Sequence, residues 1–245
     1  MTKPIETVLF DFGGTLDADG VAWKERFHTL YRSEGLNMSV DAFASAFFAA
    51  DCPLVGSLPP ATGLPETVVA LTANLEAELA RLSAGADGAG TVKDRTDGDR
   101  ARRVASRFLS GASAAFSRNR PVLEALRQRY RLGVVSNFYG NLDAVCHSAG
   151  LTPLFAVMVD SHRVGAEKPD PAIFRAALET LQAPPETTVF VGDSLRRDRE
   201  GARRAGMGFI WIAPQEVWAA EAQAAVRPLA HATVTVFSDL MKILI

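Results

Sequence analysis

The chain has 245 residues, of which 48% are hydrophobic and 22% charged, a composition that suits a globular core with a smaller companion domain. The formal net charge of −2 gives no reason to expect a nucleic-acid or membrane-surface partner. Cys52 and Cys146 lack metal-ligand spacing, and neither a signal peptide in MTKPIETVLF nor a membrane span of ~20 apolar residues is visible. We therefore expect a cytoplasmic protein, monomer or homodimer, that acts on a small molecule.

Short apolar runs alternate with amphipathic segments along most of the chain, which is typical of a parallel sheet covered by helices. The runs are nearly continuous Val, Ile, Leu and Phe, as in strands buried on both faces. Helices with Pro near their start and Gly after their end fit between the runs. The predicted strands are 7–11, 132–137, 155–160, 187–193 and 208–213, and the predicted helices are 121–129 (with Pro121 in its first turn), 141–149, 171–182 and 197–205.

Residues 17–118 contain no convincing strand and carry several apolar helical faces. We expect a helical cap there, inserted after the first strand into a Rossmann-like α/β core of residues 1–16 and 119–245. A stretch rich in Gly, Asp and Arg, residues 83–100, is predicted to be a mobile loop within the cap. The apolar faces include Trp23, Phe27, Leu30 and Tyr31; Phe43, Phe47 and Phe48; Val68, Leu71, Leu75, Leu79 and Leu82; and Val104, Phe108 and Leu109.

Polar residues follow four of the predicted strands at the point where each strand ends. The carboxyl ends of parallel strands lie at one edge of a sheet, where ligands bind near the topological switch point. We therefore expect carboxylates, a hydroxyl and amide pair, and one lysine to converge on a single site. The candidates are Asp11, Gly13, Gly14 and Thr15 after the first strand, Ser136 and Asn137 after the second, Lys168 after the third, and Asp193, Ser194 and Asp198 after the fourth.

These residue types suit the attack of a carboxylate on phosphorus. The nucleophile must overcome repulsion from an anionic substrate, and a divalent metal held by acids such as Asp11 and Asp193 removes that repulsion. Lys168 adds positive charge, while Ser136 and Asn137 can donate hydrogen bonds to phosphoryl oxygens. Hard oxygen ligands of this kind favour Mg²⁺ over zinc.

The segments DFGGTL, VVSN, EKPDPAIF and GDSLRRDREGARRAGM, in this order, resemble the haloacid dehalogenase-like hydrolase superfamily. The closest resemblance is to the branch with a helical cap inserted after the first strand. It implies that Asp11 is the nucleophile that becomes an aspartyl-phosphate, and that Ser136 and Lys168 hold the phosphoryl group. It also implies that the backbone carbonyl of Gly13, Asp193 and Asp198 form the Mg²⁺ site with Asp11. Gly14 is expected to meet a backbone requirement, and Thr15 to lie near the phosphate.

Gly13 departs from the family pattern, because phosphatases of this family usually carry there an aspartate that protonates the leaving group. Such general acid–base help is worth ~10²–10⁴-fold in rate. Asp17, Asp19 or His28 could deputise for the missing acid, although a polar turn into the cap is the simpler interpretation of the two aspartates. The remaining charged candidates are Arg118 and Arg120, weak anion-binding candidates at the hinge, and the arginines of GDSLRRDREGARR, predicted to form a solvated helix face.

Three functions remain open on the sequence. The first is a Mg²⁺-dependent phosphatase acting on a small phosphorylated metabolite. The second is a 2-haloacid dehalogenase, since dehalogenases of this superfamily also lack the second acid; they do not keep a metal aspartate in a GDS segment, and Asp193 therefore favours phosphate. The third is a catalytically weak relative that binds a metabolite, for which Gly13 is the only support.

Overall fold

Six parallel strands form one sheet within the part of the chain that the computed structural model describes, residues 4–86, 98–217, 219 and 232–245. The spatial order is β3-β2-β1-β4-β5-β6. From β1 the chain adds β2 and β3 on one side and then crosses over to add β4, β5 and β6 on the other side. The topological switch point therefore lies at the carboxyl end of β1, next to Asp11. The strands are β1 Thr7–Phe10, β2 Arg131–Ser136, β3 Val157–Asp160, β4 Thr188–Gly192, β5 Gly208–Ile212 and β6 Ala232–Val234.

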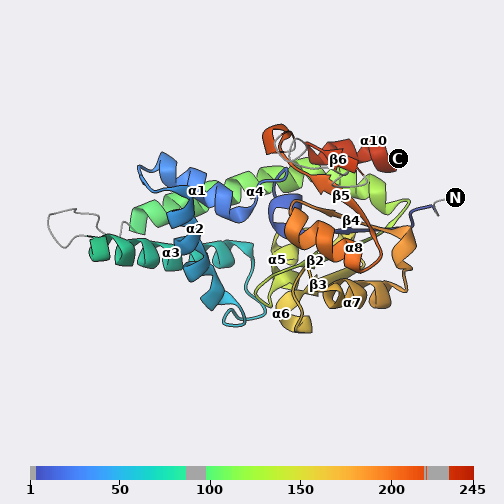
Figure 1. Cartoon of the computed structure of the whole chain (residues 1–245), viewed down its shortest axis with the longest axis horizontal. Coiled ribbons are helices and arrows are strands. Elements are labelled where there is room, and N and C mark those ends of the chain that lie inside the picture. The colour runs from blue at the N-terminus through green and yellow to red at the C-terminus, as the bar shows by residue number, and fades with distance from the viewer. Residues whose placement is uncertain (1–3, 87–97, 218, 220–231) are drawn as a thin grey trace.

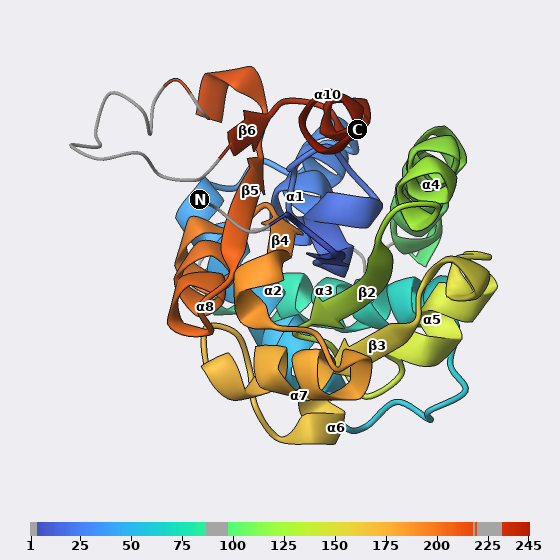
Figure 2. The ribbon, with the colours of Figure 1, turned by 90° about the vertical axis from the view of Figure 1, so that its right-hand side faces the viewer.

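Helices cover both faces of this sheet, and a helical body lies beside it (Figures 1 and 2). Leu9 and Val135 pack with α7 and α8, whereas Val8 and Val134 belong to the core on the opposite face. This alternation is the period of two that a strand imposes on its side chains. The helices are α1 Trp23–Ser33, α2 Val40–Asp51, α3 Leu64–Ala86, α4 Gly98–Arg127, α5 Leu142–Ser148, α6 Ser161–Val164, α7 Pro171–Leu181, α8 Glu200–Arg204 and α10 Leu240–Leu244.

The predicted α/β class and parallel sheet are confirmed, and α1 to α4 fill the interval between β1 and β2 as one helical body. We call residues 17–118 the cap; the division of the chain into domains stays a prediction. The short edge strand β6 was not predicted, because three residues carry too little periodicity to identify a strand. In the described ranges, no helix is both long enough and apolar enough to cross a membrane.

Helix α4 corrects the prediction that a helix begins at Pro121. It runs without interruption from Gly98 to Arg127 with Pro121 inside it, and so belongs both to the cap and to the cover of the sheet. Phe116 and Leu123 are buried along it, and Asn119 donates a hydrogen bond to the carbonyl of Leu16 at 3.0 Å. These contacts outweigh the hydrogen bond that the proline cannot donate.

The prediction that residues 83–100 form a loop is wrong at both ends of the segment. Residues 83–86 end α3 and residues 98–100 begin α4. The part of the predicted loop at 87–97 lies outside the described residues. The cap is therefore more helical than its Gly content indicates, because packing between α3 and α4 extends both helices.

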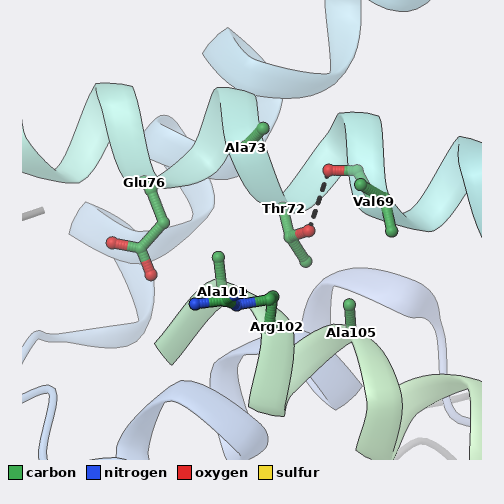
Figure 3. Close-up of a pocket in the computed structure, with 7 residues that line it drawn as sticks. All are labelled: Val69, Thr72, Ala73, Glu76, Ala101, Arg102 and Ala105. Atoms are coloured by element: carbon green, nitrogen blue, oxygen red, sulfur yellow. Dashed lines mark hydrogen bonds between the residues drawn. The ribbon is translucent and has the colours of Figure 1, made fainter. Parts of the chain in front are cut away.

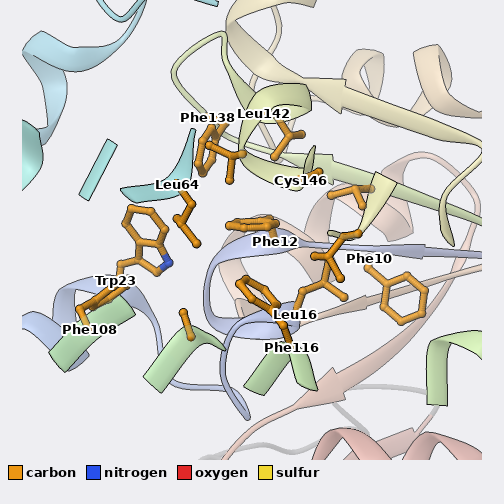
Figure 4. Close-up of a cluster of buried hydrophobic side chains, with 14 of the residues drawn as sticks. Phe10, Phe12, Leu16, Trp23, Leu64, Phe108, Phe116, Phe138, Leu142 and Cys146 are labelled. Carbon is orange, nitrogen blue, oxygen red and sulfur yellow. The ribbon is translucent and has the colours of Figure 1, made fainter. Parts of the chain in front are cut away.

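The hydrophobic core is continuous from the sheet into the cap (Figure 4). Phe12, in the turn after β1, makes an edge contact with Phe138 at a centroid separation of 5.6 Å. Trp23 from α1 meets Phe108 from α4 at 5.1 Å and Phe138 at 6.0 Å. The turn that carries the candidate nucleophile is thus held between aromatic side chains of both bodies.

Candidate active site

Asp11 lies at the carboxyl end of the central strand and is 5% exposed. Its backbone N–H donates to the carbonyl of Val191 at 2.9 Å, which ties it to β4. The hydroxyl of Ser136 donates to Oδ1 of Asp11 at 2.8 Å, and Nζ of Lys168 lies 2.7 Å from the same oxygen. Both contacts go to Oδ1, so Oδ2 is the oxygen that can approach a ligand.

Lys168 joins two carboxylates, since its Nζ also lies 2.8 Å from Oδ1 of Asp198. The lysine is 4% exposed. Burial alone would lower its pKa, but the charges of Asp11 and Asp198 outweigh burial, and the pKa lies above the usual value. The side chain therefore stays a cation within the site.

Asn137 holds the backbone of Lys168 rather than pointing its amide at an open site. Its Oδ1 accepts from the N–H of Lys168 at 2.7 Å, and its Nδ2 donates to the carbonyl of Lys168 at 3.2 Å. These two bonds fix the loop after β3 against the loop after β2. Substrate binding by Asn137 stays a prediction, whereas its positioning of Lys168 is directly visible.

Asp11, Asp193 and Asp198 form a compact acidic cluster, in which one carboxylate oxygen of each lies within 4.8 Å of the other two. Burial and the neighbouring charges of Asp198 and Asp11 raise the pKa of Asp193 well above its ordinary value. The pKa of Asp198 is also raised, chiefly by burial. Three hard oxygen donors that repel one another fit a divalent cation such as Mg²⁺, which would relieve that repulsion.

The turn after β1 is shaped by its approach to this cluster. Gly14 has φ of +91°, and a Cβ atom there would lie 2.7 Å from Oδ2 of Asp193. A side chain at this position is excluded both by backbone strain and by the carboxylate, as the predicted backbone requirement implies. The hydroxyl of Thr15 donates weakly to Oδ1 of Asp193 at 3.4 Å, so Thr15 borders the acidic cluster.

Gly13 has an ordinary backbone conformation, with φ of −77° and ψ of 119°. The indole of Trp23 covers it: a Cβ atom at position 13 would lie 3.0 Å from Nε1 and 3.2 Å from Cδ1 of Trp23. Nε1 donates to Oδ2 of Asp17 at 2.8 Å, which fixes the indole. The space that a side chain at position 13 would occupy is therefore taken by an aromatic ring.

Asp17, Asp19 and His28, the candidates to deputise for an acid at position 13, are bound to other groups away from the nucleophile. Asp17 is 1% exposed and accepts from Gly14, Trp23 and Arg26, the last at 2.5 Å. Asp19 accepts from Arg118 at 2.7 Å and from the N–H of Phe237. His28 lies within the cap, with its ring against Phe43 and Nε2 3.3 Å from the carbonyl of Met38. None of the three borders the cavity described next.

A cavity of about 600 Å³ opens over Asp11 between the cap and the sheet. Ser136, Lys168 and Gly13 border it from the sheet side. Its other lining residues include aromatic rings and charges that the sequence patterns did not single out as parts of a site. These are Trp23, Phe47, Phe48, Phe138 and Tyr139, with Lys24, Glu25, Asp51, Glu167, Arg196 and Arg197.

Arg196 and Arg197 are exposed, as the predicted solvated face of arginines implies, but they also border this cavity, which was not predicted. Arg203 and Arg204 instead pair with Glu200 on the surface. Arg196 and Arg197 belong to the helical turn Leu195–Arg199 that follows β4, whereas Arg203 and Arg204 belong to α8. The hinge arginines are also occupied elsewhere: Arg118 pairs with Asp19, Arg120 donates to the carbonyl of Gly150 at 2.6 Å, and neither lines the cavity.

A second cavity of about 370 Å³ lies between α3 and α4 inside the cap (Figure 3). Its polar groups already serve the helices themselves. Thr72 donates to the carbonyl of Val69, and Glu76 forms a two-pronged ion pair with Arg100. Neither the nucleophile candidate nor the acidic cluster borders it, so the chemistry belongs to the first cavity.

The sequence profile of the haloacid dehalogenase-like hydrolase family matches residues 5–206. The match spans most of the chain and covers every strand end that contributes to the site. The chain therefore belongs to this family of hydrolases, as the four sequence segments predicted.

Curated relatives resemble parts of the chain. Haloacid dehalogenase-like hydrolase domain-containing protein 3 of Bos taurus is 39% identical over 109 residues, or 44% of this chain and 41% of that protein. Phosphoserine phosphatase of Thermus thermophilus is 37% identical over 90 residues, or 36% of each chain. The chain thus aligns with less than half the length of these relatives.

Solved structures resemble the fold over nearly its whole length. The HAD-hydrolase YfnB of Bacillus subtilis, solved bound to magnesium, has a TM-score of 0.55 and 19% identity, covering 99% of both chains. A 2-haloacid dehalogenase of Pseudomonas syringae pv. Tomato has a TM-score of 0.52 and 24% identity, covering 98% of both chains. At these identities the likeness shows the fold alone and not the reaction.

Proposed function

We propose that this hydrolase is a Mg²⁺-dependent phosphatase that acts on a small phosphorylated metabolite. The observation that carries the proposal is the acidic cluster of Asp11, Asp193 and Asp198, whose oxygens lie within 4.8 Å of one another beside Lys168. The phosphatase among its relatives supports the same reaction class. A cytoplasmic location and small-molecule partners remain part of the proposal.

In the proposed reaction, Oδ2 of Asp11 attacks phosphorus while the bond from phosphorus to the leaving oxygen breaks. The product of this step is an aspartyl-phosphate and an alcohol or phenol. Ser136 and Lys168 hold Oδ1 at 2.8 and 2.7 Å, which aims the opposite oxygen into the cavity. Lys168 also supplies positive charge where negative charge gathers on the phosphoryl oxygens. Water then cleaves the aspartyl-phosphate and restores Asp11.

Asp11, Asp193, Asp198 and the carbonyl of Gly13 would hold the Mg²⁺ ion. When bound, the ion would neutralise charge on the carboxylates and on the phosphoryl group, which lets the two anions approach. Burial is the main cause of the raised pKa values of Asp193 and Asp198, and repulsion from the neighbouring carboxylates, which a cation would offset, adds to the rise.

The dehalogenase alternative uses the same nucleophile without a metal. It leaves the clustering of Asp193 and Asp198 beside Asp11 unexplained, because the single charge of Lys168 offsets only part of the repulsion among three carboxylates. We therefore favour phosphate over a 2-haloacid as the substrate.

One experiment separates the two reactions. The purified protein is incubated with p-nitrophenyl phosphate and a panel of phosphorylated metabolites, with Mg²⁺ or with a chelator, and phosphate release is measured. Chloride release from 2-chloropropionate is followed in parallel. We expect phosphate release that requires Mg²⁺. Chloride release in the presence of chelator would overturn the proposal in favour of a dehalogenase. Tight metabolite binding without turnover would overturn it in favour of a binding protein.

A further inference from the structure

The cavity needs a proton donor for the leaving group, and Gly13 cannot provide one. The indole of Trp23 fills the place of the usual acid, and Asp17, Asp19 and His28 do not border the cavity. The carboxyl groups on its wall besides Asp11 are Asp51, Glu25 and Glu167.

Asp51 differs from the other two in its surroundings. Glu25 and Glu167 are exposed to solvent, whereas Asp51 is half-buried and accepts a hydrogen bond from the hydroxyl of Tyr139 through Oδ1. Ser136, the last residue of β2, contacts Asp11, and Tyr139, in the loop that follows, contacts Asp51. One short loop therefore connects the nucleophile with this acid of the cap.

The position of Asp51 favours its protonated form. It is the last residue of α2, at the negative end of the helix dipole, and the last turn of α2 carries no basic residue. Burial raises its pKa, although the hydrogen bond from Tyr139 and the charge of Arg197 act against that rise. The hydrogen bond from Tyr139 thus holds Asp51 in place, while its pKa stays above the ordinary value.

Arg197 places Asp51 in the same electrostatic environment as the nucleophile. Burial opposes the charge of this arginine, but Asp11, Asp198, Asp193 and Asp51 together raise its pKa. A guanidinium that feels both Asp11 and Asp51 can stabilise the Asp51 carboxylate when it forms.

We propose that Asp51 is the general acid of this enzyme, supplied by the cap in place of the residue at position 13; the proposal rests on the phosphatase function above. Asp51 gives its proton to the leaving oxygen as the phosphorus–oxygen bond breaks, so the alcohol leaves neutral. Its carboxylate, hydrogen-bonded to Tyr139 and stabilised by the charge of Arg197, then takes a proton from the water that attacks the aspartyl-phosphate. Each turnover returns Asp51 to its protonated form.

The test compares Asp51→Asn with the wild type on alkyl phosphates and on p-nitrophenyl phosphate, with Mg²⁺ present. An alkyl leaving group needs a proton and nitrophenolate does not. For Asp51→Asn, kcat/KM should therefore fall by about 10²–10⁴-fold on alkyl phosphates and stay near the wild-type value on p-nitrophenyl phosphate. With the aryl substrate, kcat should fall and a burst of nitrophenol should appear, because dephosphorylation lacks its base.

Two further variants distinguish a chemical role from a structural one. Asp41→Asn makes the same substitution at an exposed position of the same helix and should leave kcat/KM unchanged for both substrate classes. Tyr139→Phe removes the bond that orients Asp51 and should lower kcat/KM on alkyl phosphates more than on the aryl phosphate. Thermal unfolding of each variant checks that it is folded.

If Asp51→Asn lowers kcat/KM equally on both substrate classes, or does not lower it on alkyl phosphates, Asp51 is not the general acid. Either result would leave the phosphatase function intact. If Asp51→Asn does not fold, the substrate dependence of Tyr139→Phe decides in the same way. Failure of the wild type to hydrolyse any phosphate ester with Mg²⁺ would instead overturn the phosphatase proposal, and the role of Asp51 with it.

Discussion

The indole nitrogen of Trp23 lies 3.0 Å from the point that a Cβ atom of residue 13 would occupy. Glycine at position 13 and tryptophan at position 23 are therefore packed as a pair: the ring rests where a side chain would otherwise stand. The backbone of Gly13, with φ of −77°, would accept any residue. The obstacle to an acid at this position is the ring and not the backbone.

A double-mutant cycle tests this packing. Gly13→Asp alone should lower the free energy of unfolding by about 1–3 kcal/mol, because the new side chain overpacks against the indole. Trp23→Phe alone should cost about 1–3 kcal/mol, since Asp17 loses a buried donor. The double variant should lose less unfolding free energy than the sum of the losses in the two single variants. Urea denaturation measures all three, and strict additivity would contradict the pairing of residues 13 and 23.

Gly14 and Gly35 have nearly the same positive φ angle but different surroundings, so they can be compared directly. Their φ angles are +91° and +89°, but a Cβ atom at Gly35 has no neighbour within 4 Å, whereas one at Gly14 would lie 2.7 Å from Oδ2 of Asp193. Gly35→Ala should cost only the backbone strain, about 1–2 kcal/mol. Gly14→Ala should cost more and should also raise the Mg²⁺ concentration needed for half-maximal activity. Equal stability losses with unchanged metal dependence would show that Gly14 does not shape the acidic cluster.

The two cysteines should react differently with an alkylating reagent. Cys146 is fully buried, and burial together with the nearby Asp143 charge raises its pKa to about 12. Cys52 is exposed and borders the cavity. Because the thiolate is the reactive form, iodoacetamide near neutral pH should label Cys52 alone in the folded protein and both residues after unfolding in urea. Peptide mass spectrometry reads the outcome, and labelling of folded Cys146 would contradict its burial.

The residues at the strand ends were predictable because the parallel sheet itself brings them together. Asp11, Ser136, Lys168, Asp193 and Asp198 follow runs whose apolar character identifies them as buried strands, and such strands end at a common edge. Their convergence follows from topology, which short-range sequence patterns can reveal.

The cap's contribution could not be predicted in the same way. Trp23 and Asp51 lie on amphipathic helices, where the sequence indicates the buried face but not which core residue that face meets. The position of Arg197 beside the cavity could not be predicted, because the segment after β4 has no distinctive sequence pattern. Pro121 misled the prediction of a helix start, since tertiary packing along α4 outweighs its local cost.

The proposal that Asp11 is the nucleophile is tested most directly by following the phosphoryl group during turnover. The protein is mixed with radiolabelled aryl phosphate and Mg²⁺, quenched in acid during turnover, and its peptides are mapped. If Asp11 is the nucleophile, the label should lie in a peptide that contains Asp11, should be lost on treatment with hydroxylamine, and should be absent from Asp11→Asn. Label on another residue, or undiminished turnover by Asp11→Asn, would contradict the proposal.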